Sequence, residues 1–174
     1  VAPGEAIVGA ERGHQAEGPP GRLVRVVAQS LGCHLVEPFL QPPPPLGFGA
    51  SPNEPGDFDA DGWPDVAVVN GAEDSVSVLL GDGDGTFGPE QSLTVGSTPH
   101  GLAALDVDGD ADLDLVTSNY DASNLSLLIN DGAGSFSVAG AFDAGSGDEW
   151  TVTAGDFDED GLLDLAVGLW NPSE

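Results

Sequence analysis

Positively charged side chains are nearly missing from this sequence. Its 174 residues include three arginines, no lysine and 30 acids, giving a formal net charge of −27. All three arginines, Arg12, Arg22 and Arg25, lie in residues 1–50, so residues 51–174 carry 26 acids and a net charge of −26. This field repels nucleic acids and anionic membranes, which bind through basic side chains. The partners that it favours are cations.

Cysteine and long hydrophobic runs are also scarce. A single cysteine, Cys33, cannot form an internal disulfide, so disulfides do not stabilise the fold. No apolar run approaches the ~20 residues needed to cross a bilayer, and no membrane insertion is expected. The first residue is Val1, and the start shows no basic segment followed by a hydrophobic core. We therefore expect that a leader has been removed or that the chain is part of a longer one.

The acids that are present follow a repeated pattern. Three nine-residue segments begin at Asp57, Asp106 and Asp156, and each has aspartate at its first, third, fifth and ninth places. Twelve of the 26 acids fall on these places, whereas a merely solvated acidic surface predicts scattered ones. The candidate side-chain ligands of a cation are Asp57, Asp59, Asp61 and Asp65; Asp106, Asp108, Asp110 and Asp114; and Asp156, Asp158, Asp160 and Asp164.

Calcium is the cation that fits this pattern best. It takes six to eight oxygen ligands at roughly 2.3–2.6 Å, whereas magnesium requires stricter octahedral geometry and tends to keep its waters. The carbonyls of Trp63, Asp112 and Leu162, at the seventh places, complete the predicted sets, so about three ions are expected. An EF-hand would have glutamate at the twelfth place, between two helices. The twelfth places here are Val68, Thr117 and Val167 in β-branched runs, which excludes that motif.

The Asp-rich segments belong to a longer repeat with a period of 49 to 50 residues. Residues 75–80 match 124–129, and the glycine-rich stretch 81–87 matches 130–136, which predicts a hairpin turn. Each period thus offers four short strands. In the second period we expect them at 101–105, 113–118, 125–129 and 135–142. Four antiparallel strands per 40 to 50 residues are typical of a propeller blade, and no sustained helical periodicity is present.

Two departures from the pattern lead to further expectations. Residues 51–56 stand where the first strand of the first period should lie, but Pro52 and Pro55 argue against a central strand there, so we expect the first period to lack its first strand. In the second Asp-rich segment Ala111 replaces the glycine found at the sixth place of the others, Gly62 and Gly161. Because this place often needs a left-handed backbone, we expect the second site to be looser.

The repeated loop, strands and glycine turn resemble the FG-GAP/VCBS repeats of integrin-α-type β-propellers. The resemblance covers residues 51–174. It implies calcium held between the first two strands of a blade, at the rim of a propeller that usually has seven blades. It also implies an extracellular, secreted or cell-surface location. The chain would supply about two and a half blades, with further blades coming from the same parent protein. An open array capped by residues 1–50 is the alternative.

The predicted organisation is therefore all-β, a partial β-propeller of four-stranded antiparallel blades with calcium loops. Residues 1–50, with breakers such as 18–21 and 42–45, are interpreted as a poorly ordered Pro/Gly-rich extension or linker. Residues 51–174 are divided into repeats at about 51–96, 97–146 and 147–174, the last incomplete.

Two functions remain open at this point. The first is a non-catalytic calcium-binding module that mediates adhesion or binds a protein or carbohydrate ligand. The second is a propeller segment of a secreted enzyme, such as a carbohydrate-active one, whose catalytic residues lie partly outside this chain. No catalytic residue is assigned. Trp63, Trp150 and Trp170 could stack against sugars, although the places of Trp150 and Trp170 at strand ends favour a structural role for those two. His100 is interpreted as a lone histidine without a partner.

Overall fold

The structure is a computed structural model that describes residues 50–145 and 148–170. The predicted extension therefore lies outside the described residues, except for Ala50. The described part consists of strands and turns without a helix, and accordingly it has no helix long and apolar enough to cross a membrane. Its strands are β1 (Ala50–Gly56), β2 (Asp65–Asn70), β3 (Ser75–Leu79), β4 (Gln91–Thr94), β5 (Pro99–Leu105), β6 (Asp114–Asn119), β7 (Asn124–Asn130), β8 (Phe136–Phe142), β9 (Asp148–Gly155) and β10 (Asp164–Trp170).

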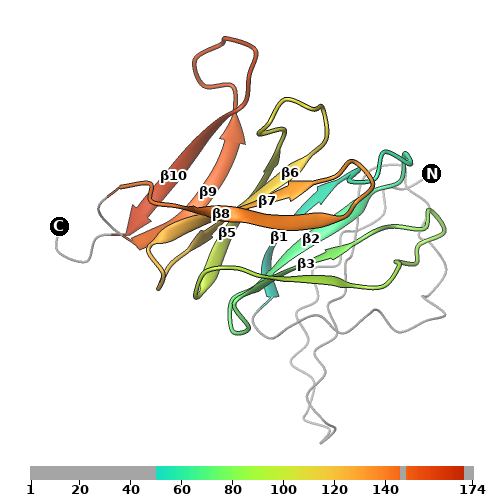
Figure 1. Cartoon of the computed structure of the whole chain (residues 1–174), viewed down its shortest axis with the longest axis horizontal. Coiled ribbons are helices and arrows are strands. Elements are labelled where there is room, and N and C mark those ends of the chain that lie inside the picture. The colour runs from blue at the N-terminus through green and yellow to red at the C-terminus, as the bar shows by residue number, and fades with distance from the viewer. Residues whose placement is uncertain (1–49, 146–147, 171–174) are drawn as a thin grey trace, which may run out of the picture.

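These strands form three antiparallel sheets in chain order. Two sheets have four strands, β1-β2-β3-β4 and β5-β6-β7-β8, and the third pairs β9 with β10. The first strands of successive sheets are neighbours, with β1 next to β5 and β5 next to β9 (Figure 1). The last strands β4 and β8 also lie against each other. The all-β prediction is confirmed, and open sheets stacked in this way fit consecutive propeller blades.

The second repeat follows its predicted strands closely. Its observed strands, β5 to β8, differ from the predicted bounds by at most two residues at any end. The reason is its sequence, in which each strand is a short apolar or alternating run that ends at an asparagine or just before an aspartate. Local pattern and tertiary packing therefore agree throughout this repeat.

The expectation that the first repeat lacks its first strand is wrong. Residues 50–56 form β1, which pairs with β2 in a register that places Pro55 opposite Val66. Among the described strands β1 is the outermost of its sheet, so only one of its edges is paired there, and proline is tolerated at such an edge. A register shift between Ala50 and Asn53, around Pro52, further accommodates the missing backbone N–H.

Two hydrophobic clusters separate the three sheets. The first lies between the two four-stranded sheets and contains Phe58, Ala67, Val69, Val76, Val78, Leu102, Leu115, Leu128 and Phe136. The second lies between the middle sheet and the β9–β10 pair and contains Ala103, Leu105, Val116, Leu125 and Val152. Neighbouring residues of β6, Leu115 and Val116, therefore point into different clusters, as the alternation of a strand requires. The middle sheet is covered on both faces.

The packing between the sheets predicts that leucine-to-alanine substitutions at a buried and at an exposed position differ clearly in their effect on stability. Leu115 is fully buried, whereas Leu169 at the end of β10 is 42% exposed. Leu115→Ala should lower the free energy of unfolding by about 2–5 kcal/mol, because it leaves a cavity in the core. Leu169→Ala should cost less than about 1 kcal/mol. Urea denaturation followed by circular dichroism measures both, and equal losses would contradict the assigned core.

Candidate metal centre

The three Asp-rich segments occupy equivalent positions in the fold. Each connects the first strand of a sheet to its second strand, as β1 to β2, β5 to β6 and β9 to β10. All three loops therefore project from the C-terminal ends of the first strands (Figure 1). Strands flank each of them on both sides, in agreement with the exclusion of an EF-hand. We call residues 57–65, 106–114 and 156–164 the first, second and third Asp loops.

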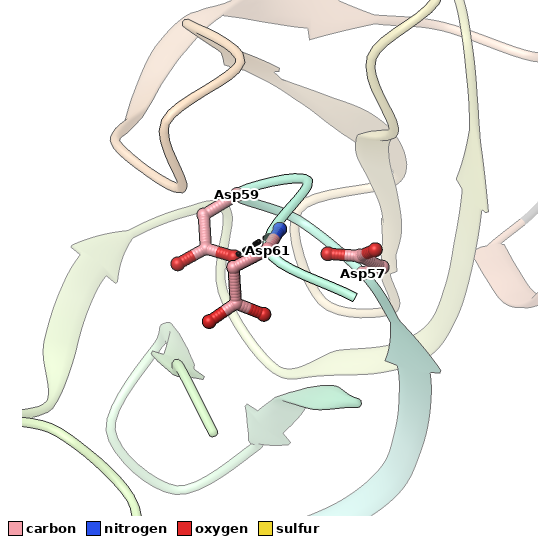
Figure 2. A group of neighbouring side chains, drawn as sticks. All are labelled: Asp57, Asp59 and Asp61. Atoms are coloured by element: carbon pink, nitrogen blue, oxygen red, sulfur yellow. Dashed lines mark hydrogen bonds between the residues drawn. The ribbon is translucent and has the colours of Figure 1, made fainter. Parts of the chain in front are cut away.

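Three carboxylates converge in each Asp loop. In every group, one oxygen from each residue lies within 4.8 Å of the corresponding oxygens of the others. In the first loop the acids of the first, third and fifth places form the group, and Figure 2 shows Asp59 beside Asp61 with the carboxylate of Asp57 facing them across the turn. In the other two loops the acid of the ninth place takes part instead of the fifth. The groups are Asp57, Asp59 and Asp61; Asp106, Asp108 and Asp114; and Asp156, Asp158 and Asp164.

Of the predicted side-chain ligands, Asp65, Asp110 and Asp160 lie outside these groups. The structure tests neither them nor the predicted carbonyl ligands of Trp63, Asp112 and Leu162. Asp110 Oδ1 and Asp160 Oδ1 instead accept hydrogen bonds from the backbone N–H two residues later, at 3.0 and 2.8 Å. Turns of this kind are a typical local use of aspartate in a tight loop.

The first aspartate of each loop organises the backbone around it. Asp57 Oδ2 accepts a hydrogen bond from the N–H of Gly62 at 3.1 Å. In the second loop Asp106 Oδ2 accepts from Ala111 at 3.0 Å, and in the third loop Asp156 Oδ2 accepts from Gly161, also at 3.0 Å. The sixth residue thus folds back onto the first in every copy. This closure brings the intervening acids to one side of the turn.

The sixth place requires a left-handed backbone in all three loops. The φ angles are +88° at Gly62, +77° at Ala111 and +92° at Gly161. The left-handed region open to residues with a side chain lies at about +50 to +70°, so Ala111 is strained where glycine is not. At the fourth place φ is also positive, but Ala60 at +58° falls within that region. The backbone strain at Ala111 is thus the one from which a looser second site was expected. The looseness itself stays a prediction.

The aspartate at the ninth place of the Asp loop holds two parts of its sheet together. Asp114 is fully buried, and its Oδ2 accepts a hydrogen bond from the N–H of Val107 at 2.9 Å. Its Oδ1 accepts another from the N–H of Asn130, also at 2.9 Å, where the glycine turn after β7 begins. Asp65 does the same in the first repeat, with the N–H groups of Phe58 at 2.6 Å and Gly81 at 2.7 Å. This bridging role was not predicted from the sequence.

The signal for that bridge is present in the repeat spacing. Gly81 follows Asp65 by 16 residues, and Asn130 follows Asp114 by the same number. A constant offset between a loop acid and the start of a hairpin turn is compatible with contact between them. Spacing alone could not show it, because the partner atom is a backbone N–H that any residue except proline supplies.

Asn130 adds a contact between neighbouring repeats. Its side-chain Nδ2 donates a hydrogen bond to the carbonyl of Phe58 in the first Asp loop at 2.7 Å, and another to the carbonyl of Leu113 in the second loop at 3.2 Å. Asn130 itself is buried. Backbone atoms of two successive Asp loops are therefore joined through one amide group.

Side chains at the seventh place pack onto the glycine turn of their own sheet. A β-carbon added at Gly83 would lie 2.4 Å from the ring of Trp63, and one at Gly132 would lie 2.2 Å from Oδ2 of Asp112. Both glycines also have positive φ angles. Glycine is therefore required in each turn, because the Asp loop leans directly on the backbone there.

Negative charge is disfavoured at several places in these loops. Desolvation raises the pKa of Asp59, and repulsion from the other carboxylates of its loop raises it further. The same two causes raise the pKa values of Asp108 and Asp112 in the second loop. A carboxyl group whose pKa is raised by folding makes the folded state less stable as pH increases through that pKa. In the absence of a cation, the ionised forms of Asp59, Asp108 and Asp112 therefore lower the stability of the folded state at pH values above these raised pKa values.

The fold and these loops define the chain as a β-repeat protein with an acidic loop between the first two strands of each repeat. A family model described as an FG-GAP-like repeat matches residues 57–117 and 106–167. The chain belongs to this FG-GAP-like repeat family. Comparison with curated proteins and with solved structures gives no match. The predicted family resemblance is thus confirmed, and the two matches begin at the first and second Asp loops.

The bridging role of the ninth aspartate predicts unequal effects within one loop. Asp114→Ala should lower the free energy of unfolding by about 2–5 kcal/mol even in a chelator, because it leaves the N–H groups of Val107 and Asn130 without an acceptor. Asp110→Ala should cost less than about 1 kcal/mol in chelator, because Asp110 is exposed. Thermal denaturation in EDTA compares the two. Similar losses would show that the bridge contributes nothing.

The strained backbone at the sixth place predicts a stabilising substitution. Ala111→Gly should raise the free energy of unfolding by up to about 1 kcal/mol, because relief of the left-handed alanine outweighs the greater chain entropy of glycine. Ala60→Gly is the control, since its φ of +58° already suits a residue with a side chain and the gain should be smaller. Chemical denaturation measures both, and a gain for Ala60→Gly alone would contradict this explanation.

Proposed function

We propose that each of the three Asp loops binds one calcium ion. The observation that carries this proposal is the convergence of three carboxylate oxygens within 4.8 Å in every loop. Two oxygens that share a calcium ion at roughly 2.3–2.6 Å are separated by at most about 5 Å, so these groups match the span of one coordination shell. The donors are all oxygen, which suits a hard cation. The predicted carbonyl ligands and the remaining loop aspartates would fill further positions.

Electrostatics supports a resident cation. Residues 51–174 contain no lysine or arginine that could neutralise the loops. The raised pKa values of Asp59 and Asp108 indicate that their ionised forms are disfavoured without a counter-charge. A bound divalent ion would remove this repulsion and fix the turn, so binding energy would appear as folding stability. Calcium is preferred to magnesium, because irregular loops with many carboxylates suit its larger and more variable shell.

The wider role that we propose is that of a non-catalytic module in an extracellular or cell-surface protein. FG-GAP-like repeats are typically non-catalytic and typically occur in such proteins. Calcium is plentiful outside cells, where even sites with dissociation constants of about 10⁻⁴–10⁻³ M stay filled. With its loops stabilised by calcium, the repeat array would present its surfaces to a protein or carbohydrate ligand, in adhesion or in ligand binding.

Calcium should bind tightly enough to change the melting temperature. At free calcium 100-fold above the dissociation constant, each occupied site should add about 2.7 kcal/mol of stability. Isothermal titration should give about three calcium ions per chain, and differential scanning calorimetry should show a lower melting temperature in EDTA than in calcium. Magnesium at the same concentration should stabilise less.

Variants of the first loop provide the control. Asp57→Asn combined with Asp59→Asn should remove one ion from the titration, because two of the three converging carboxylates lose their charge. Asp84→Asn should leave the stoichiometry unchanged, since Asp84 is an exposed acid in the glycine turn that bonds to Thr86. Identical melting curves in calcium and in EDTA would refute calcium binding.

A further inference from the structure

The turn that connects β7 to β8 lies between the first two Asp loops. It comprises residues 131–135, and we call it the central turn. On one side, a β-carbon added at Gly132 would lie 2.2 Å from Oδ2 of Asp112 in the second loop. On the other side, a β-carbon added at Gly134 would lie 3.2 Å from the Cβ of Asp59 in the first loop. The backbone of the central turn therefore packs against both loops.

Asn130, which directly precedes the central turn, is bonded to both loops. Its Nδ2 donates one hydrogen bond to the carbonyl of Phe58 at 2.7 Å and another to the carbonyl of Leu113 at 3.2 Å. Phe58 lies between two aspartates of the first carboxylate group, and Leu113 directly precedes Asp114 of the second group. Asn130 is only 2% exposed, so water cannot replace a lost partner, and each lost bond leaves a buried polar atom unpaired.

The ring of Phe58 makes a second connection between the first loop and the second repeat. This ring is buried and meets the ring of Phe136 edge to face, with the two centroids 5.5 Å apart. Phe136 is the first residue of β8, directly after the central turn. The first loop therefore contacts the residues at both ends of the central turn, and a displacement of this loop would disturb the turn from both sides.

The third Asp loop has no such hydrogen bond to another repeat among the described residues. The hydrogen bonds that its aspartates accept come from its own backbone, as from Phe157 to Asp164 and from Gly161 to Asp156. Phe157, the counterpart of the buried Phe58, is 58% exposed. The first two loops are therefore linked to each other, whereas the third is not linked to either of them.

The third repeat is joined to the second at the other ends of the strands. The Nδ1–H of His100 donates a hydrogen bond to the carbonyl of Trp150 at 3.0 Å, and the centroids of their rings are 3.9 Å apart. The expectation that His100 has no partner is therefore wrong. Like Val152 of the second hydrophobic cluster, Trp150 faces the middle sheet, and because it is partly exposed it continues this apolar layer into solvent. This contact does not involve an Asp loop.

We propose that Asn130 positions both of the first two Asp loops for calcium, so that these two sites fill cooperatively while the third fills independently. This inference rests on the proposed function, because it concerns the same calcium sites. An ion bound in either loop fixes the backbone that carries its ligands, and with it the carbonyl that Asn130 contacts. Asn130 and the central turn are then already ordered when the other loop binds its ion, which therefore loses less conformational entropy. By linkage, each site strengthens the other by the same factor.

The first repeat shows that the side-chain bridge is separate from the backbone bridge. Gly81 occupies the place of Asn130 in the first repeat, and its N–H donates to Asp65 just as the N–H of Asn130 donates to Asp114. Glycine, however, has no amide side chain that could reach a neighbouring loop. The backbone hydrogen bond is thus common to both repeats, whereas the connection between two Asp loops is specific to Asn130.

The test measures each calcium site separately in the whole chain. The backbone N–H groups of Gly62, Ala111 and Gly161 bond to the first aspartate of their own loops, so their NMR signals should report calcium binding one loop at a time. Asp57→Asn combined with Asp59→Asn removes the first site. Calcium binding reported by Ala111 should then weaken at least about fivefold, while binding reported by Gly161 should not change.

The comparison is matched in charge. Four aspartates and one calcium ion give the occupied first loop a net charge of −2, and the two aspartates left in the variant loop also give −2. A weaker second site is therefore not an effect of net charge. Removing the second site with Asp106→Asn and Asp108→Asn should in turn weaken the first site by the same factor.

Two asparagine substitutions then locate the coupling. Asn130→Ala should remove it, so that loss of the first site no longer weakens the second. Asn119→Ala is the matched control, because Asn119 is also buried and its Nδ2 also donates two hydrogen bonds, but to Asn124 and Ser126 within its own sheet. This control should lower the melting temperature and keep the coupling. Melting curves in calcium show which variants are folded, and Asn130→Gly, which copies Gly81, is used if the alanine variant unfolds.

Three outcomes would overturn the inference. The second site could keep its affinity when the first is removed, the third site could weaken as much as the second, or a folded Asn130 variant could keep the coupling. Three sites that fill independently would reject the role of Asn130 and leave the calcium proposal standing. N–H signals that do not respond to calcium at all would instead reject the proposed function itself.

Discussion

The hydrogen bonds of the ninth aspartate are the interaction on which the arrangement of each complete repeat depends. A carboxylate that is buried without a positive partner is costly unless its oxygens are bonded. Asp65 and Asp114 meet this requirement with backbone N–H groups alone, one from the Asp loop and one from the start of the glycine turn. Because these donors belong to different hairpins, the hydrogen bonds to one carboxylate hold the two hairpins against each other. These bonds keep the Asp loop against the sheet without the help of a bound ion.

The two ends of the strands therefore have different chemistry. At one end, aspartates that repel one another are held together by backbone hydrogen bonds. At the other end, aromatic rings continue the apolar layer between the sheets into solvent. The length of the strands in each sheet separates the two ends, so a change at either end need not disturb the other. The Asp loops and the exposed aromatic rings are therefore separate features of one small repeat array.

Much of the fold could be predicted from the sequence, because the pattern of each strand occurs in more than one repeat. The strands of the second repeat and the family were predicted from local pattern. β1 was missed because two prolines count against a strand only where both edges are paired, and edge position is a property of the whole sheet. The convergence of Asp57, Asp59 and Asp61 was predicted, while the contacts of Asp114 were not, since their donors are backbone groups. The partners of His100 were missed as well, because Trp150 lies 50 residues away.

The amide of Asn130 has a consequence for how the two complete repeats are connected. It bonds to the backbone of Phe58 in one repeat and of Leu113 in the next, and it is buried where it does so. The first repeat is therefore tied to the second through hydrogen bonds to its backbone, and not only through side-chain packing. Separating the two sheets would require the loss of these bonds together with the exposure of the apolar core between them.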